Sequence, residues 1–349
     1  MRHDNKKAAA PRFSGGENAA AAKARCMYAD RLTKDDYKEL IMCNSVGEAA
    51  SYLNTKKRYA NVLRNERAIS GMHREQIEYM LEKRKYDDYV KLSSYLMGSG
   101  DYIRHFLSAR REVSLLVYAV SSLCSSNCDD YFYILMSDFD KESPVDIAML
   151  SEAKTYDEIV HACESTVYAD VLKKYAPKKS TFTDIVHLEA DLWNLLFCEI
   201  FTRIKELPSK SERNEAHDIF KSYIDAKNIA ALSRFRNYSE CDVGYVLRSL
   251  IKYGNISEKT LKDIFTQSGT GSLQGDKMID TLMAKGYDSE THICEKKCRK
   301  YLRYSSHPAI TVLSYLYLLE TELANIIKIV EGIRYSLAKE KITAMISEE

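Results

Sequence analysis

The chain has 349 residues and contains 13 glycines and 5 prolines, less than half the usual share of these turn-forming residues. So few turn formers argue against a fold of β-hairpins or glycine-rich nucleotide loops and favour long helices. Hydrophobic residues make up 45 % and charged residues 29 %, which excludes a disordered chain, and the formal net charge of +1 excludes a general attraction to nucleic acid or anionic membranes.

Helix-start signals recur along the chain. Ser45-Val-Gly-Glu48 and Thr155-Tyr-Asp-Glu158 are predicted capping boxes, and Thr33-Lys-Asp-Asp36 is a weaker version. Ser143 is a predicted N-cap, with Pro144 at the first helical position. No stretch alternates polar and apolar residues between hairpin turns. The predicted fold class is therefore all-α.

The last long helix is the clearest single element. Leu207-Pro208 ends an earlier long helix, and His307-Pro308 opens this one. Apolar residues then recur in alternating steps of four and three, which predicts a continuous seam packed against other helices. The seam residues are Val312, Leu316, Leu319, Leu323, Ile326, Val330, Ile333 and Leu337.

Short internal repeats indicate three helical units. Tyr59-Ala-Asn-Val-Leu63 recurs as Tyr168-Ala-Asp-Val-Leu172, each time after a capped short helix. Asp225-Ala-Lys-Asn228 is echoed by Glu322-Leu-Ala-Asn325 and by Asp101-Tyr-Ile-Arg104. The predicted organisation is a flexible tail over residues 1–17, followed by helical repeats over 18–120, 121–240 and 241–349.

Motifs for catalysis are absent from the sequence. Gly269-Thr-Gly271-Ser-Leu-Gln-Gly275-Asp-Lys277 does not have P-loop spacing and follows no predicted strand. Asp138-Phe-Asp140-Lys-Glu142 resembles the start of a calcium loop, but Ser143 stands where an EF-hand requires glycine. The eight histidines include no HExxH pair. We therefore predict no catalytic residue, no bound cofactor and no enzymatic activity.

Two cysteine pairs have a spacing of four, which places both members on one helix face. They are Cys124 with Cys128 and Cys294 with Cys298, the latter close to His292. A zinc site is one interpretation, although zinc knuckles usually have a two-residue spacer in a turn. Half-buried helical thiols are the preferred interpretation, so we predict no metal.

No predicted segment spans a membrane. The longest apolar stretches, over 113–119, 192–200 and 310–319, are shorter than the ~20 residues that a bilayer requires. The basic tail over 1–17 has no apolar core and is not a secretory signal. These features predict a soluble protein of the cytoplasm.

Several motifs resemble one family in the same order along the chain. Asp225-Ala-Lys-Asn228-Ile229 with Arg234 resembles its "DxxNI…LxR" motif, and Tyr253-Gly254-Asn255-Ile256 resembles its "GG.L" step. The C-terminal signature is carried by His307-Pro308, Tyr315, Glu320, Glu322, Asn325-Ile326 and Glu331-Gly332. Over most of residues 18–345 the chain is similar to the C/d-type subunit of V-type and archaeal-type (V/A) rotary ATPases. Residues 127–139 have no counterpart that we can align.

The resemblance implies both a fold and a role. It implies three pseudo-threefold-related helical bundles that form a funnel-shaped socket. Such a socket is a non-catalytic subunit of a hetero-oligomer, and it joins the central-stalk rotor to the membrane ring that carries protons or sodium. The resemblance therefore implies a peripheral subunit on the cytoplasmic face of the membrane, with no nucleic-acid partner and no membrane span of its own.

The polar residues of these motifs have two interpretations. They either tie helices together through buried hydrogen bonds and ion pairs, which we favour, or line the contact surfaces of the socket. These structural or interface candidates are Asp225, Asn228, Arg234, His307, Glu320, Glu322 and Asn325. Two other hypotheses for the whole protein remain: a helical-repeat adaptor for unrelated partners, and an all-α metalloenzyme that uses His292, Cys294 and Cys298.

Overall fold

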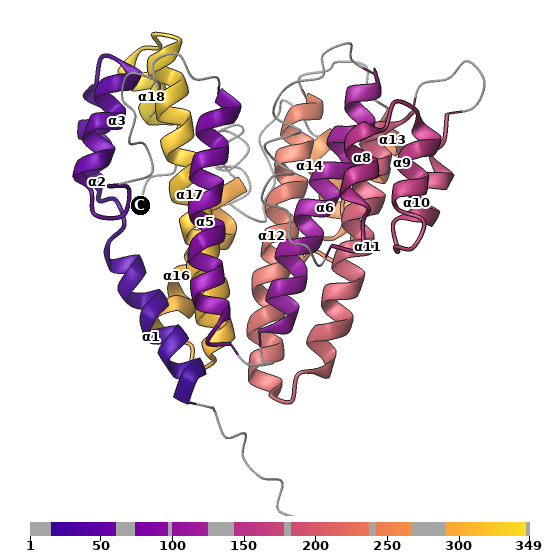
Figure 1. Ribbon diagram of the computed structural model, residues 1–349, viewed down its shortest axis with the longest axis horizontal. Helices are drawn as coiled ribbons and strands as arrows, with labels where there is room; N and C mark the ends of the chain where they lie inside the picture. Colours follow the sequence, from indigo (N-terminus) through magenta and orange to yellow (C-terminus); the bar gives the residue numbers. More distant parts are fainter. Residues whose placement is uncertain are drawn as a thin grey trace, which may run out of the picture.

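The computed structural model contains helices and no strand among the residues that it describes, which confirms the all-α prediction. The described residues are 15–60, 74–96, 100–124, 143–177, 183–236, 242–266 and 290–346. Long helices run side by side along the molecule, and the shorter helices gather in the upper half of the view (Figure 1). The long helices form three groups, according to which of them pack against each other.

The first group joins the two ends of the chain. Its long helices α1 (Gly15–Ala29) and α5 (Arg74–Ser93) both pack against α17 (Pro308–Arg334), on the left of Figure 1. The short helices around them are α2 (Lys34–Met42), α3 (Val46–Thr55) and α18 (Lys339–Met345). The last long helix therefore packs against elements almost 300 residues earlier in the chain.

The second group consists of α6 (Asp101–Cys124) packed along α11 (Ile185–Glu206). Its short helices are α8 (Ile147–Glu152), α9 (Tyr156–Ala162) and α10 (Ala169–Lys174). Aromatic rings fill the space between α6 and α11. The ring centroids of Phe106 and Phe197 lie 6.2 Å apart, and Phe197 stacks on Trp193 of the same helix, so aromatic packing holds α6 against α11.

The third group consists of α12 (Lys210–Arg236) packed along α16 (Glu290–Tyr304). The short helices α13 (Val243–Arg248) and α14 (Glu258–Thr266) enclose a small core of their own with the end of α12. Contacts between α16 and α17, and between α11 and α12, join this group to the other two. Most of the other buried apolar side chains form one continuous core.

The predicted helix caps are partly confirmed. Thr155 and Glu158 form the predicted capping box, and Thr33 with Asp36 forms a complete one as well. Ser45 caps α3 as predicted, but the carboxylate of Glu48 accepts a hydrogen bond from the Asn44 amide instead of from Ser45. The box at residue 45 is therefore only half formed.

The prediction for Ser143 is wrong. The N-cap of α8 is Asp146, which accepts from the Met149 amide, and the helix begins at Ile147. The hydroxyl of Ser143 instead accepts from the Val145 amide and donates to Glu112. An acid three residues further on can cap a helix as well as a serine can, and here the tertiary contact with Glu112 engages the serine.

The predicted tail over 1–17 is too long by three residues. The helix α1 begins at Gly15, and Glu17 in its first turn is buried with 7 % of its surface exposed. The alanines that follow, Ala20 and Ala24, are fully buried in the core with α17 packed against their helix. Small side chains allow this close approach without a strongly apolar sequence, which is why composition placed the boundary late. Residues 1–14 lie outside the described part of the chain.

The predicted seam on α17 is confirmed from Val312 to Ile333, and all seven residues are buried. The helix ends at Arg334, however, so Leu337 lies beyond it, after a turn at Ser336 with φ 51°. Gly332 lets α18 pack closely, because a Cβ there would collide with Ile342. By length and composition α17 could cross a membrane, but 78 % of its most apolar window is buried inside the protein, so it is a core helix.

Candidate functional site

A buried carboxylate on α17 binds the segments that follow α1 and α3. Glu322 is 6 % exposed, and its Oε2 accepts a hydrogen bond from the Leu32 amide at 3.2 Å. Its Oε1 accepts from Arg58 Nη1 at 3.2 Å and from the Tyr59 hydroxyl. Burial raises the pKa of Glu322, although the guanidinium and the hydrogen bonds oppose the shift. We call this contact the Glu322 junction.

The same guanidinium extends the Glu322 junction to α5. Arg58 Nη2 donates to the Tyr315 hydroxyl at 2.7 Å, and that hydroxyl donates to Asp88 Oδ2 at 2.7 Å. Asp88 is fully buried on α5, with Arg84 Nη2 3.3 Å from its other oxygen. A continuous network of hydrogen bonds and ion pairs therefore connects α17 to the segment that follows α3 and to α5.

A second buried acid, on α12, binds the turn before α14. Asp225 is 3 % exposed, and its oxygens accept hydrogen bonds from the Ile256 amide and the Asn255 side chain, both at 3.0 Å. Gly254 permits this approach, because a Cβ there would collide with the Asp225 carboxylate. Tyr253, where the family motif has glycine, adopts a left-handed φ of 76°. We call this contact the Asp225 junction.

Asn228 completes the Asp225 junction one helical turn later. Its amide nitrogen donates to the Ile251 carbonyl and its oxygen accepts from the Ile251 amide, each at 2.8 Å. Asn228 is 2 % exposed. A single buried side chain thus satisfies both backbone groups of Ile251, which otherwise would be costly to bury. The pair Asp225 and Asn228 therefore fixes the chain entering α14 to α12.

A third junction involves a residue that the sequence analysis missed. Glu112 on α6 is 4 % exposed and accepts hydrogen bonds from the hydroxyls of Tyr168 at 2.7 Å and Ser143 at 2.9 Å. We call this contact the Glu112 junction. The repeated pair Tyr59 and Tyr168 was the signal for it, because both tyrosines donate to a buried acid on a long helix.

The Glu322 junction shares one kind of contact with each of the other two: a backbone-amide donor with the Asp225 junction and a tyrosine hydroxyl donor with the Glu112 junction. Leu32 and Ile256 both precede the hydroxyl residue that caps the next short helix, and each donates its amide to the buried acid. Asp101 is not the counterpart that its sequence echo predicts. It lies half exposed in the first turn of α6, paired with Arg104 and Arg203. Glu112, and not Asp101, accepts the hydroxyl of the repeated tyrosine, so the echo had the wrong register.

Glu320 lies where helices of all three groups meet. Arg110 of α6 donates to both of its oxygens, one contact at 2.6 Å, and Lys85 of α5 lies 3.7 Å away. Burial opposes ionisation, but Arg110, Lys85 and Lys227 of α12 outweigh it and lower the pKa of Glu320 to about 2. Glu320 is therefore a carboxylate at neutral pH, held by cations from three long helices.

The remaining predicted residues lie apart from one another. Arg234 is exposed near the end of α12, away from Asp225. His307 is buried as the N-cap residue of α17, with its amide donating to Ser305 Oγ at 3.1 Å. Asn325 is 2 % exposed, one turn after Glu322. The structure thus brings together Asp225 with Asn228, and Glu322 with Asn325, but not all seven candidates at one place.

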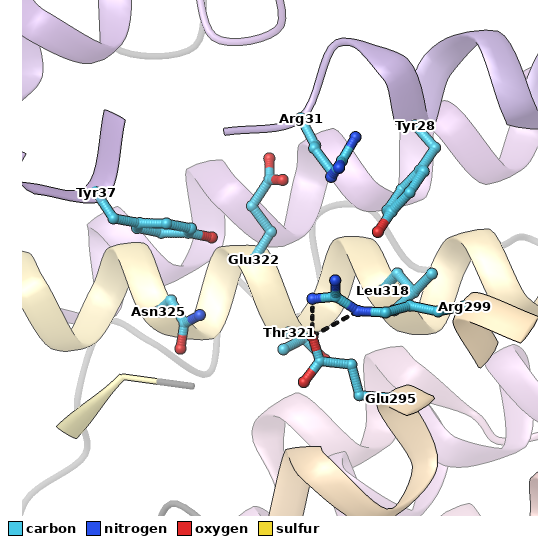
Figure 2. Close-up of a pocket in the computed structure, with 9 residues that line it drawn as sticks. All are labelled: Tyr28, Arg31, Tyr37, Glu295, Arg299, Leu318, Thr321, Glu322 and Asn325. Atoms are coloured by element: carbon cyan, nitrogen blue, oxygen red, sulfur yellow. Dashed lines mark hydrogen bonds and ion pairs between the residues drawn. The ribbon is translucent and has the colours of Figure 1, made fainter. Parts of the chain in front are cut away.

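Glu322 and Asn325 border a small pocket between α1, α2, α16 and α17 (Figure 2). Arg299 and Glu295 on its α16 side are paired with each other, at 2.5 Å. The cavity volume is about 10 Å³, which is room for roughly one water. Pockets for metabolites are typically ~300 Å³ or more. This pocket is therefore part of the packing around the Glu322 junction.

The cysteines and loops considered for chemistry give no site within the described residues. Cys294 and Cys298 are fully buried on α16 with their sulfurs 3.7 Å apart. Among the described residues, no three His, Cys, Asp or Glu side chains converge to hold a metal. The side chains of Cys124, Cys128 and His292, and the segments 138–142 and 269–277, lie outside the described part of the chain.

Comparison with known proteins agrees with the sequence resemblance. The model of the family described as ATP synthase (C/AC39) subunit matches residues 20–345. No curated protein matches the chain. The family match spans all three junctions and nearly the whole length of the chain. The chain therefore belongs to the ATP synthase (C/AC39) subunit family, the C/d-type subunits of V/A-type ATP synthases.

Proposed function

We propose that this protein is a non-catalytic central-stalk subunit of a V/A-type rotary ATPase. In this role it is a socket that couples the rotor shaft to the membrane ring during ATP-driven proton or sodium transport. It is a peripheral subunit on the cytoplasmic face of the membrane. The observation that carries the proposal is the family match over residues 20–345. The geometry of the junctions adds a physical reason why the chain suits a mechanical role.

The three junctions support a pseudo-threefold division into units 18–120, 121–240 and 241–349. Glu112 of the first unit binds Tyr168 of the second, and Asp225 of the second binds Ile256 of the third. Glu322 of the third unit binds Leu32 of the first. Each unit thus holds the next, and the last holds the first, as a closed cycle requires.

A closed cycle suits a part that transmits torque. Each connection is buried and uses a carboxylate, and hydrogen bonds to charged groups are about twice as strong as neutral ones. Sliding one unit past another would leave a buried carboxylate without donors, at a cost of several kcal/mol. The junctions therefore resist relative movement of the units, and the protein would turn as one body.

A coupling subunit needs two separate binding surfaces, and α17 has an exposed aromatic residue at each end. Tyr304 precedes the helix with 73 % of its surface exposed, and Tyr335 follows it with 70 % exposed. A helix of 27 residues is about 40 Å long. Exposed tyrosines are favoured at protein interfaces. We therefore assign one of these ends to the shaft and the other to the ring.

Co-purification and transport measurements test the role. We expect the tagged full-length chain to recover both stalk and ring subunits from detergent-solubilised membranes. Membranes from a strain that lacks the gene should retain the ring but fail to couple ATP hydrolysis to ion transport. The purified protein alone should hydrolyse no ATP. Recovery of neither partner, together with normal pumping in the deletion strain, would instead support the helical-repeat adaptor.

Two matched variants separate the surfaces. Tyr304→Ala and Tyr335→Ala each remove one exposed ring and leave the junctions intact. We expect both proteins to keep the wild-type unfolding midpoint. Each should lose affinity for only one partner, Tyr304→Ala for one and Tyr335→Ala for the other. If both variants bind both partners as tightly as the wild type, the assignment of the ends of α17 is wrong.

A further inference from the structure

A second group of acids lies outside the three junctions. Glu212, in the first turn of α12, is 5 % exposed, and its Oε1 has no hydrogen-bond partner among the described residues. Its Oε2 lies 3.8 Å from Nδ1 of His307. Glu17 of α1 is also buried, with 7 % of its surface exposed. These acids lie near the end of the molecule at which α1, α6, α12 and α17 begin (Figure 1).

Neighbouring elements contribute further polar groups near this end of α12. From α6, Tyr102 is buried, and within the described part of the chain its hydroxyl also has no hydrogen-bond partner. From α12 itself, Glu215 accepts a hydrogen bond from Ser305 Oγ at 2.6 Å. From α1, besides Glu17, Arg25 donates to the carbonyls of Leu302 at 2.8 Å and Ser305 at 2.9 Å.

The balance of these groups disfavours a negative charge on Glu212. Arg25 hydrogen-bonds carbonyls rather than a carboxylate, and His307 is a cation only when protonated. The first turn of α12 favours an anion, but by only ~1 kcal/mol. Burial first, and then the charges of Glu17 and Glu215, raise the pKa of Glu212 to about 7.

The residues that the structure describes around Glu212 do not form a metal site. Within the described part of the chain, no cluster of three His, Cys, Asp or Glu side chains has the geometry to hold one. A buried carboxyl without a cation or metal partner is neutralised by protonation. The unpartnered oxygen of Glu212 is the atom that can carry this proton.

We propose that Glu212 binds a proton reversibly in the folded protein, and that loss of this proton loosens the joint between α12, α1 and the α16–α17 connection. In the protonated state Glu212 adds no charge beside Glu17 and Glu215. In the ionised state three carboxylates share a poorly hydrated space, and their repulsion is relieved when the first turns of α12 move away. This inference goes beyond the rotary role and does not depend on it.

The pH dependence of stability follows from the raised pKa. A carboxyl that binds its proton more tightly when folded stabilises the protein below its ordinary pKa, and this contribution is lost as pH rises through about 7. Glu212→Gln mimics the protonated form at every pH. We therefore expect this variant to have a higher urea midpoint than the wild type at pH 8. The advantage should shrink steadily as pH falls to 5.

Infrared difference spectroscopy of the full chain measures the proton directly. We expect a protonated-carboxyl band that titrates near pH 7 in the wild type and is absent in Glu212→Gln. Glu206→Gln, an exposed acid at the end of α11, is the matched control and should keep the band. Glu17→Gln removes a like charge without changing Glu212, so the band should titrate at a lower pH. This variant and the wild type test the proposal even if Glu212→Gln does not fold.

Hydrogen–deuterium exchange tests the loosening of the joint. After correction for intrinsic exchange rates, the first turns of α12 should exchange faster at pH 8 than at pH 6 in the wild type, but not in Glu212→Gln. The proposal is overturned by either of two results. One is the absence of a titrating carboxyl between pH 6 and 8 in the wild type. The other is α12 exchange that does not change with pH.

Discussion

The Glu322 and Asp225 junctions use the same position in the fold but different electrostatics. Both acids are buried on a long helix and accept the backbone amide that precedes a short helix. Glu322 also holds the buried guanidinium of Arg58, whereas the hydrogen-bond donors to Asp225 are neutral. Burial raises the pKa of both carboxyls. The geometry of the contact is therefore repeated between units, while its net charge is not.

The largest expected effect comes from Glu322→Gln. This variant keeps the size of the side chain but leaves Arg58 buried without a counter-ion. Breaking a buried ion pair in this way typically costs ~3–5 kcal/mol. We expect a loss of unfolding free energy of that size in urea denaturation. The double variant with Arg58→Met should recover part of the loss. If Glu322→Gln lowers the unfolding free energy by less than ~1 kcal/mol, the ion pair with Arg58 does not distinguish the Glu322 junction from the Asp225 junction.

Glu320 provides the next largest effect, and it depends on pH. Its pKa is about 2 in the folded protein, below the ordinary value of 4.5, because the cations around it outweigh its burial. The contribution of ionised Glu320 to the free energy of unfolding is therefore present above pH 4.5 and is lost as pH falls toward 2. At 1.36 kcal/mol per pKa unit the contribution is at most about 3 kcal/mol. We expect wild type and Glu320→Gln to converge in stability on acidification. A constant difference would contradict the assigned ion pair with Arg110.

A smaller effect is expected at the Glu112 junction. Tyr168→Phe removes one of the hydroxyls that donate to the buried Glu112. Hydrogen bonds to charged groups contribute ~1.5–3 kcal/mol, and the ring of Tyr168 still packs in the core. We expect a loss of about 2 kcal/mol in the unfolding free energy. Tyr95→Phe, at an exposed tyrosine, is the control and should have no effect. If Tyr168→Phe and Tyr95→Phe change the unfolding free energy equally, the hydrogen bond from Tyr168 to Glu112 does not stabilise the fold, and Glu112 does not form a junction.

The smallest effect should come from Asp225→Asn, the isosteric counterpart of Glu322→Gln. Asparagine can still accept from the Ile256 amide, and no cation is left unpaired. The loss of the second hydrogen bond is offset by removal of a charge whose burial is unfavourable. We expect a change of less than ~1 kcal/mol. Measured side by side, the two isosteric variants test the electrostatic difference. Equal losses would mean that the junctions are alike after all.

Local patterns predicted much of the fold. The all-α class, the start of α17 at His307-Pro308 and the cap at Thr155 follow from rules that act within a few residues. The site was predicted in part, because the paired acid and amide at Asp225 and Asn228 recur on α17. These predictions were possible because a helix cap and an acid–amide pair on one helix each involve residues only a few positions apart.

Contacts between distant segments could not be predicted from local patterns. Glu112 has no amide partner one turn later, so only its contact with Tyr168, 56 residues away, reveals its role. The Ser143 cap failed for the same reason, since its hydroxyl bonds to Glu112 across helices. Arg58 likewise depends on Glu322, 264 residues away, for its burial. Such pairings follow from how the units pack, which single-sequence periodicity does not encode.

Electron cryomicroscopy of the complex purified through a tag on this chain tests whether the protein is a socket between shaft and ring. We expect a rotary ATPase in which this protein lies between the membrane ring and the foot of the central shaft, with opposite ends of α17 nearest the two partners. The three units should be joined by the Glu112, Asp225 and Glu322 junctions. If the density for this chain lies away from the rotor axis, or if the purified assembly lacks a ring and a shaft, the proposed role is wrong.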